Sequence, residues 1–280
     1  MGQNVIKIKS RIKSVTGAYK VTSAMKLVST VKLKQWKNKM LANKDYNTQL
    51  KEVVDLLLMF SKKVDSPFMK TNDGAKKKLY VIISSTLGLC GSYNTNIFKV
   101  SDAKITKDDD AIILGQKGIT RYSKGEFKII SGFEENSSLT DKAFVNKIKR
   151  YILKEYLKGT YSEIHIIYSE YKNSLVFLAK DYMLLPFISS KEESNDYPPI
   201  FEPSIDELVD KLIPFYLETC LYSKLLESAV CEQAARSNAM ENATNNAKDL
   251  LDELHIEFNK ARQGAITQEI TEIVAAAKAM

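Results

Sequence analysis

The chain of 280 residues has few cysteines, little histidine and no long hydrophobic run. Its three cysteines, Cys90, Cys220 and Cys231, form no CxxC pair and have no histidine nearby, so the pattern argues against a zinc site or a disulfide framework and predicts free thiols. The first ten residues contain no long apolar stretch and no small-residue cleavage site. No window approaches the roughly 18 uncharged apolar residues of a membrane span. We therefore expect a protein of the cytoplasm or another reducing compartment.

Helix-breaking residues and acidic residues are missing from the N-terminal region. No proline precedes Pro67 and no glycine lies in residues 18–71, so nothing there obliges a helix to stop. No acidic residue precedes Asp45, whereas eleven basic residues lie in residues 1–44. The balance reverses in residues 215–280, which hold ten acidic and six basic residues. The two ends of the chain are therefore oppositely charged.

Both ends carry the apolar repeat of a coiled coil. Alternating steps of three and four residues from Val5 to Leu57 meet apolar residues at eleven of sixteen positions. The same steps from Leu226 to Ala265 meet them at nine of twelve. Near Gly264 this second seam changes phase, as in a stutter, and continues through Ile266, Ile270, Ile273 and Ala277. The second helix is expected to begin near Ser204, an acceptable N-cap.

The middle of the chain has the short apolar runs of strands. They cover residues 79–84, 111–114, 127–130, 164–168 and 175–178, with glycines between them and a helical stretch at 139–157. This alternation predicts a Rossmann-like α/β domain with a mostly parallel sheet. We expect three parts: an N-terminal coiled-coil helix (1–66), an α/β domain with a foot segment (67–203) and a C-terminal coiled-coil helix (204–280).

The length of the helices suggests how they are arranged. At about 1.5 Å per residue, residues 4–60 would span about 85 Å and residues 215–280 about 100 Å, against about 30 Å for a small domain. Because one helix precedes the domain and the other follows it, the simplest arrangement is a two-stranded antiparallel coil, with the basic helix along the acidic one. The fold class is therefore α/β with a long two-helix coil.

Three candidate sites can be weighed. The turn Gly88–Gly91 follows a strand, as a phosphate-binding loop does, but it lacks the Walker lysine and the GxGxxG spacing and favours a structural turn. Cys90 could act as a nucleophile, yet neither His165 nor His255 has an orienting partner that can be read from the sequence. The basic helix could bind nucleic acid, but its lysines alternate with an apolar seam and no nucleic-acid motif is present. Neither a catalytic residue, a metal site nor a cofactor is indicated.

The C-terminal segment is unusually apolar for a free helix end. Residues 261–280 contain four alanines near the end and only three charges after Arg262. Such a helix, if uncovered, would promote aggregation of a free monomer. We expect a hydrophobic partner to enclose it.

Several segments, taken together, resemble the gamma subunits of F-type ATP synthases. Residues 20–28 (KVTSAMKLV) are similar to the KITKAMxMV segment of that family, and residues 88–94 (GLCGSYN) to its GLCGxxN turn. The most specific similarity is in the C-terminal helix, at residues 232–236 with 239–240, 259–263 and 266–274. The resemblance runs from end to end of the chain.

The resemblance implies a central rotor shaft that couples proton flow through the membrane c ring to ATP synthesis or hydrolysis, without an active site of its own. It implies alpha, beta, epsilon and c subunits as partners, and a peripheral position at the cytoplasmic face of the membrane. By matching motif, the contacts with the beta subunits would be made by Met25, Arg262, Gln263, Thr267 and Glu269, and Glu202 would lie near the c ring. Helical spacing led us to expect one polar stripe from the four C-terminal residues, beside the isoleucine seam.

Two departures from the family pattern stand out. Thr86 and Leu87 occupy the place of an acidic–basic pair before the GLCG turn, which puts a hydrogen-bonding role of that loop in doubt. Ser23 replaces a lysine and removes one charge beside the beta subunit. Two other readings stay open at this point: a nucleic-acid-associated coiled-coil protein, and a small α/β enzyme whose helices only dimerise it.

Overall fold

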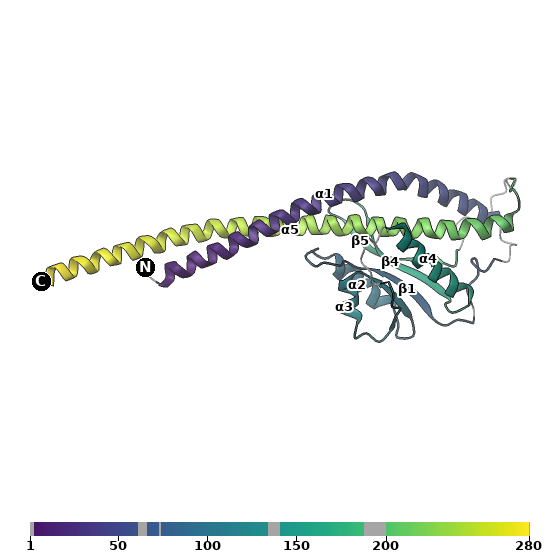
Figure 1. Cartoon of the computed structure of the whole chain (residues 1–280), viewed down its shortest axis with the longest axis horizontal. Helices are drawn as coiled ribbons and strands as arrows, with labels where there is room; N and C mark the ends of the chain where they lie inside the picture. The colour runs from purple at the N-terminus through teal and green to yellow at the C-terminus, as the bar shows by residue number, and fades with distance from the viewer. Residues whose placement is uncertain (1–2, 61–65, 73, 134–140, 188–199, 280) are drawn as a thin grey trace. The chain divides into compact units, whose positions relative to one another are not determined.

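The computed structural model describes residues 3–60, 66–72, 74–133, 141–187 and 200–279. Along the chain, the long helix α1 comes first and the long helix α5 comes last, with the other helices and strands between them (Figure 1). The helices are α1 (Gln3–Phe60), α2 (Tyr93–Lys104), α3 (Gln116–Tyr122), α4 (Lys142–Leu157) and α5 (Ile205–Ala279). The strands are β1 (Lys78–Ile83), β2 (Asp110–Leu114), β3 (Lys128–Ile129), β4 (Glu163–Tyr171) and β5 (Phe177–Leu185). None of the helices in these ranges is both long and apolar enough to cross a bilayer.

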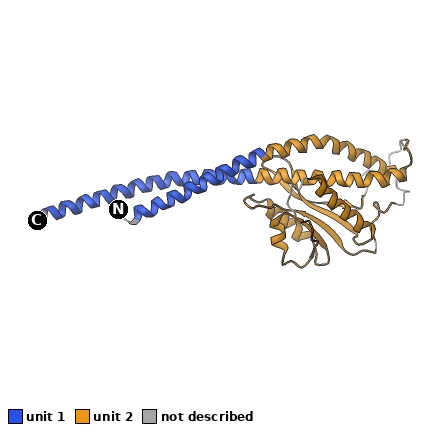
Figure 2. Ribbon diagram, viewed as in Figure 1, with its two compact units in different colours: residues 1–31, 236–280 blue, residues 32–235 orange. Residues whose placement is uncertain are grey.

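The chain forms two compact units (Figure 2). The first, which we call the coil unit, consists of residues 1–31 and 236–280, and the second, the sheet unit, of residues 32–235. Each long helix contributes residues to both units. The three-part division at residues 66 and 203 stays a prediction.

The coil unit is an antiparallel helix pair, as predicted. Polar contacts between described residues join α1 to α5. The hydroxyl oxygens of Thr22 and Thr244 lie 3.0 Å apart, and so do those of Thr30 and Ser237. Between these pairs, Lys26 Nζ lies 2.7 Å from Glu241 Oε1. From one contact to the next, the residue number rises by four on α1 and falls by three or four on α5, so the two helices are antiparallel.

The predicted seam is the face that α1 buries. All sixteen seam positions from Val5 to Leu57 are buried or half-buried, and so are all twelve seam positions from Leu226 to Ala265 on α5. The phase-shifted continuation behaves differently, because Ile266, Ile270 and Ile273 are all exposed. Extending the register places the first residues of α1 opposite the residues near Arg262, so α5 continues beyond the end of its partner helix.

The sheet unit contains a five-stranded sheet in the order β3-β2-β1-β4-β5. The first four strands are parallel, and β5 pairs with β4 in the antiparallel sense. β1 and β2 are almost completely buried, as the near-continuous apolar runs of a sheet covered on both faces require. Both the mostly parallel sheet and its α/β layering were predicted.

Helices cover both faces of this sheet. On one face, Tyr80 and Ile82 of β1 pack with Ile97 of α2 and Tyr122 of α3. On the other face, the alternate residues of β1 belong to a larger core that includes Ile148 of α4, and parts of α1 and α5. The period-two alternation of β1 thus divides the unit into two hydrophobic layers.

The last strand differs from the prediction. The apolar run at 175–178 was expected to be a strand, but β5 begins at Phe177 and continues to Leu185. Asn173 Oδ1 accepts hydrogen bonds from the backbone N–H groups of Leu175 and Val176, which builds the hairpin turn instead. The predicted helix at 139–157 is present as α4, capped by the Asp141 carboxylate, and its first two expected residues lie outside the described ranges.

Candidate functional site

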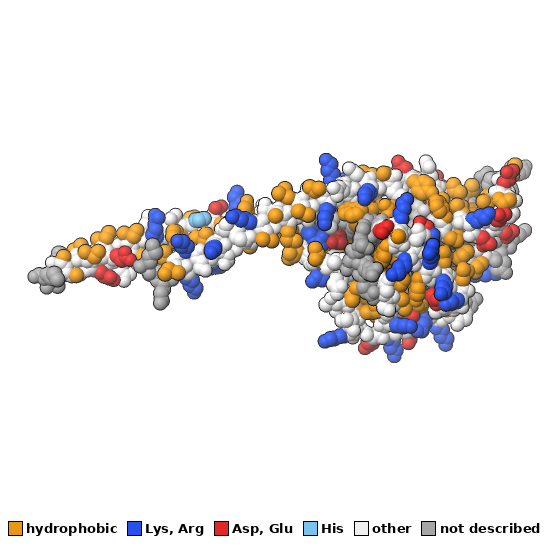
Figure 3. Space-filling model, in the orientation of Figure 1, with side chains coloured by type: hydrophobic (Ala, Val, Ile, Leu, Met, Phe, Trp, Pro, Cys, Tyr) orange, Lys and Arg blue, Asp and Glu red, His pale blue; other side chains and the backbone are white. Residues whose placement is uncertain are grey.

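The exposed end of α5 is the first candidate functional surface. The side chains of Ile266, Ile270 and Ile273 are about half to two-thirds exposed, and Val274 follows them on the last described turns. Figure 3 shows apolar side chains along this end of the helix. An uncovered apolar row on a helix is a surface that a partner can bury.

Four of the predicted site residues flank this row. Arg262, Gln263, Thr267 and Glu269 are all exposed on the same turns of α5. At 100° per residue, however, Arg262 and Glu269 lie on one side of the isoleucine row, and Gln263 and Thr267 lie on the other. The expectation of one polar stripe beside the seam was therefore wrong, because the apolar row passes between two polar edges.

This arrangement has the layout of a small protein interface, with an apolar centre and polar rims. Thr267 Oγ1 donates to the carbonyl of Gln263 at 2.9 Å, so its hydroxyl proton is used within the helix and its oxygen can still accept a bond. Gln268 and Glu272, on the opposite side of the helix, are hydrogen-bonded to each other at 3.0 Å.

The other two predicted site residues lie elsewhere. Met25 is half-buried on α1, next to Lys26, whose partner Glu241 is 21 residues before Arg262. At about 1.5 Å per residue this places Met25 roughly 30 Å along the coil from the exposed end. Glu202 is an exposed residue of the sheet unit, just before α5. The structure therefore groups the four C-terminal residues and separates them from Met25.

Most basic residues of α1 in the coil unit point to solvent. Lys7, Lys9, Lys13 and Lys20 are exposed, and Lys26 is the residue that pairs with an acidic side chain of α5. The lysines thus flank the seam rather than neutralise it. A surface of this kind is electrostatically suited to acidic partners.

Backbone N–H groups next to the glycine-containing turn after β1 form hydrogen bonds within the protein. Ser85 N donates to Asn94 Oδ1, Lys117 N donates to the Ser85 carbonyl, and Gly118 N donates to Ser84 Oγ. A Cβ atom at Gly115 would lie only 2.2 Å from the Ser84 carbonyl oxygen, so the backbone just after β2 is in direct contact with the backbone just after β1. These N–H groups are used inside the fold and do not form a phosphate cradle.

Cys90 is buried in the same turn. Its sulfur lies 3.3 Å from Asn94 Nδ2 and 3.6 Å from Ser85 Oγ, and it packs with Tyr93 and with Cys231 of α5. The α5 helix thereby covers the carboxyl end of the sheet next to this turn. Burial raises the pKa of Cys231 well above its usual range, so that thiol stays neutral. Within the described ranges, no group of histidine, cysteine and acidic residues could hold a metal ion.

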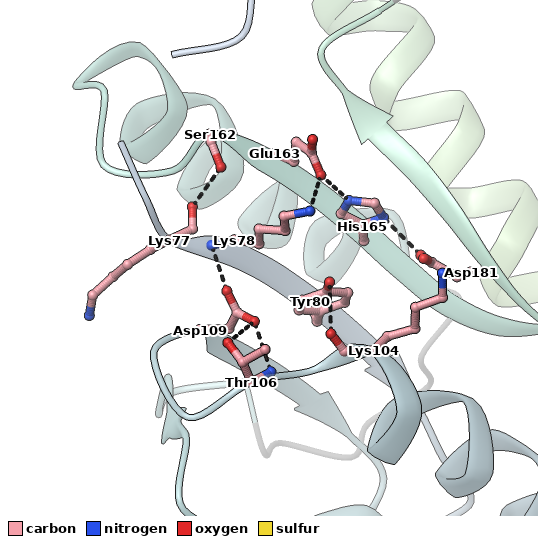
Figure 4. Close-up of polar contacts among 10 residues, drawn as sticks. All are labelled: Lys77, Lys78, Tyr80, Lys104, Thr106, Asp109, Ser162, Glu163, His165 and Asp181. Carbon is pink, nitrogen blue, oxygen red and sulfur yellow. Dashed lines mark hydrogen bonds and ion pairs between the residues drawn. The ribbon is translucent and has the colours of Figure 1, made fainter. Parts of the chain in front are cut away.

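Sequence reasoning missed a polar cluster around His165 (Figure 4). His165 was expected to lack an orienting partner, but its ring nitrogens contact Asp181 and Glu163, and its ring stacks on Tyr80 at 5.1 Å between centroids. The pairing of Glu163 with His165 could have been found, because residues two apart in a strand share a face. Asp181 could not, since it comes from the neighbouring strand.

The two units together define a class of protein. An antiparallel coil with an uncovered apolar end, together with an α/β unit whose loop donors are bonded internally, is typical of a subunit of a larger assembly.

Comparisons with known proteins agree and name the family. The family model described as ATP synthase matches residues 4–280. The chain is 36% identical to the ATP synthase gamma chain of Chlorobium limicola, over 98% of this chain and 97% of that one. It is 35% identical to the gamma chain of Clostridium pasteurianum, over 100% and 99% of the two chains. This chain belongs to the ATP synthase gamma chain family.

Solved structures share the fold. The rotor of the Euglena gracilis mitochondrial ATP synthase has a TM-score of 0.67 at 17% identity, covering 95% of this chain and 100% of that chain. The central stalk and c-ring structure from Tetrahymena thermophila has a TM-score of 0.58 at 23% identity, covering 80% and 99%. The family assignment gives no support to the nucleic-acid-associated alternative.

Proposed function

We propose that this chain is the central rotor shaft of an F-type ATP synthase, coupling proton flow through a membrane c ring to ATP synthesis or hydrolysis in an alpha/beta hexamer. The observation that carries the proposal is the match to the gamma chain family over residues 4–280, which includes the uncovered end of α5. The coil unit is the part suited to lie inside a ring of partner subunits.

The proposed partners are the alpha, beta, epsilon and c subunits. The similar solved structures are a rotor, a central stalk with c ring, and an assembly that contains F1 and the c ring. We assign beta-subunit contacts to Met25 and to the two polar edges of the α5 end, and a c-ring position to Glu202. The chain would then be a peripheral protein at the cytoplasmic face of the membrane.

We further propose that this subunit takes no catalytic part and binds no cofactor. The support is the internal bonding of the Ser85, Lys117 and Gly118 N–H groups beside the GLCG turn. Cys90 in that turn is buried, with Asn94 and Ser85 as polar neighbours. ATP chemistry would belong to the partner subunits. The three-part division at residues 66 and 203 is kept as part of the proposal.

The rotor role is tested by replacing Met25 in the assembled complex. A lysine at this half-buried position of α1 would form an ion pair with a beta-subunit carboxylate that rotation must break at every step. In Met25→Lys complexes we expect ATP-driven proton pumping to fall much more than ATP hydrolysis. Met25→Leu is the control, because it keeps an apolar side chain of similar size and should leave both rates near those of the parent.

Subunit stoichiometry is checked on the same preparations. Equal losses of pumping and hydrolysis, or no loss of either, in stoichiometric complexes would contradict the proposal that Met25 faces the beta subunits in turn as the shaft rotates. Failure of alpha and beta subunits to co-purify with the parent chain would contradict the rotor assignment itself.

A further inference from the structure

The sheet unit contains a basic groove whose lining includes none of the residues assigned above to beta-subunit or c-ring contacts. It lies between α1, α5 and the β4–β5 hairpin and has a volume of about 510 Å³. Five lysines and a single glutamate line it, and we call it the lysine groove. The lysines are Lys37, Lys44, Lys51, Lys172 and Lys224. Its volume falls within the range of about 300 to 1,000 Å³ typical of small-molecule sites.

Two of these lysines have no ion-pair partner among the residues that the structure describes. Lys51 pairs with Asp55 at 2.6 Å, and Lys172 pairs with Glu170 at 2.9 Å. In contrast, neither Lys37 nor Lys44 has a carboxylate within ion-pair distance in the described part of the chain, although Lys37 Nζ lies 5.9 Å from the centre of the Tyr171 ring. Residues seven apart lie on one face of a helix, and Lys37, Lys44 and Lys51, separated by two such intervals, form a row on α1.

The fifth lysine is held in place by aromatic and polar neighbours. Lys224 Nζ donates to the Tyr168 hydroxyl at 2.8 Å and lies 3.7 Å from Glu227 Oε2. Burial raises the pKa of Glu227, an effect that Lys224 only partly offsets. The backbone N–H of Tyr171 also donates to Glu227, at 2.9 Å. The single acidic residue of the groove is thus already engaged by donors of the protein.

The groove also contains a polar side chain without a partner. Both amide atoms of Asn47, Nδ2 and Oδ1, are shielded from solvent, and neither forms a hydrogen bond within the described residues. A buried amide of this kind costs stability unless another molecule bonds to it. Nearby, burial raises the pKa of Tyr182 to about 12, so its phenol keeps its proton at neutral pH, and that phenol is hydrogen-bonded to the side chains of Tyr216 and Cys220.

We propose that the lysine groove binds a small polyphosphate anion. Lysines are compact point charges with several donors, and they bind phosphate oxygens as such, while the one glutamate that lines the groove is already bonded within the protein. Lys37 and Lys44 supply the uncompensated charge, and the unpartnered amide of Asn47, which also lines the groove, supplies a donor. The site lies wholly in the sheet unit and does not depend on the rotor role.

The test is titration calorimetry of the full-length chain with pyrophosphate at low salt. We expect saturable binding that weakens as ionic strength rises. Lys37→Ala and Lys44→Ala should each weaken it by about fivefold, a change typical of losing one solvent-accessible ion pair. Lys34→Ala is the matched control, because Lys34 is an exposed lysine of α1 outside the groove and should bind like the parent.

A second variant separates binding from folding. Asn47→Leu removes the unpartnered amide at similar volume, so it should raise the melting temperature while weakening pyrophosphate binding by about tenfold. Parallel titrations use ADP and citrate. Binding of ADP as tight as that of pyrophosphate, or tighter, supports a phosphate site, whereas equal binding of citrate would overturn the phosphate assignment.

Chemical acetylation of the lysines, measured by mass spectrometry, shows which lysines bound pyrophosphate protects, either in the isolated chain or in the assembled complex. Saturable protection of Lys37 and Lys44 by pyrophosphate, with Lys34 unaffected, supports the proposal. Absence of saturable binding, equal affinity in the groove variants and in Lys34→Ala, or uniform protection of all three lysines would overturn it. Any of these outcomes would leave the Met25 experiment unaffected.

Discussion

The Nδ1 atom of His165 lies 2.8 Å from Oδ1 of Asp181, on the adjacent antiparallel strand (Figure 4). On the other side of the ring, Nε2 lies 3.0 Å from Oε2 of Glu163, which also receives Lys78 at 2.7 Å. Both ring nitrogens can donate to carboxylates only if the imidazole is protonated. Burial by itself lowers the pKa of His165, but the hydrogen bonds to Asp181 and Glu163 outweigh it, and the pKa is raised.

This pKa shift predicts a pH-dependent stability. Because the folded-state pKa of His165 is above the unfolded value of about 6.5, the stabilisation is complete below that value and is lost as pH rises through the folded-state pKa. Asp181→Asn should therefore reduce the free energy of unfolding by about 1 to 3 kcal/mol at pH 6 and by less at pH 9. Urea unfolding at the two pH values measures both differences.

The other histidine provides the control for that experiment. His255 is exposed on α5, so His255→Gln should leave the pH profile of stability unchanged. A loss of stability in Asp181→Asn that is as large at pH 9 as at pH 6 would contradict a role for the imidazolium.

Two glycines should respond in opposite ways to alanine. A Cβ atom at Gly118 would lie 2.6 Å from Ser84 Oγ and 2.7 Å from Ile113 Cγ2, whereas at Gly17, inside α1, it would meet nothing within 4 Å. We expect Gly118→Ala to destabilise the chain by about 1 to 3 kcal/mol through overpacking. Gly17→Ala should stabilise it by up to about 1 kcal/mol, because alanine favours the helix. Denaturant unfolding of both variants checks the sign, and a common sign would contradict this packing.

The coil register can be tested by a cross-link. Thr22 and Thr244 face each other with their hydroxyl oxygens 3.0 Å apart, so cysteines at both positions should form a disulfide under mild oxidation. The three native cysteines are buried and should contribute little background. Because both helices belong to one rotor, the cross-link should leave ATP hydrolysis by the assembled complex nearly unchanged.

A cysteine pair displaced along the coil is the matched control. Thr16→Cys with Thr244→Cys shifts one partner by nearly two helical turns and should form far less disulfide. Loss of hydrolysis on oxidation of the Thr22/Thr244 pair, restored by a reductant, would show that the two helices must move against each other during turnover.

The polar edges of the α5 end should affect turnover more than assembly. If Arg262 and Gln263 bond to a beta subunit only in certain rotary states, Arg262→Leu or Gln263→Leu should slow steady-state ATP hydrolysis. A charge-assisted hydrogen bond of about 1.5 to 3 kcal/mol corresponds to a tenfold effect or more. Gln268→Leu is the matched control, since Gln268 lies on the face opposite the isoleucine row. Full activity of Arg262→Leu in stoichiometric complexes would mean that this edge is only solvated surface.

Local periodicity was enough to predict the long helices. An apolar repeat of three and four residues requires only that the chain be helical and that one face meet a partner, so the seam from Val5 to Leu57 could be identified residue by residue. The start of α5 was equally local: Ser204 Oγ accepts a hydrogen bond from the N–H of Glu207, as an N-cap does.

Features that depend on pairing between distant segments could not be predicted in this way. The position of β5 depended on the Asn173 turn, whose hydrogen bonds outweighed the apolar character of residues 175–178. The two polar edges of the α5 end are different, because the rotation of 100° per residue along one helix is enough to place them on opposite sides of the isoleucine row.

The sequence by itself determined the two helices, their buried faces and the family, since these depend on local spacing and on motifs read along the chain. Only the tertiary structure decided that Asp181 meets His165, because that contact requires the antiparallel pairing of β4 with β5. In the same way, Lys37 and Lys44 line a groove only because the fold places α5 and the β4–β5 hairpin beside α1. Charged side chains interact strongly only at short distances, and for residues on different elements the fold sets those distances.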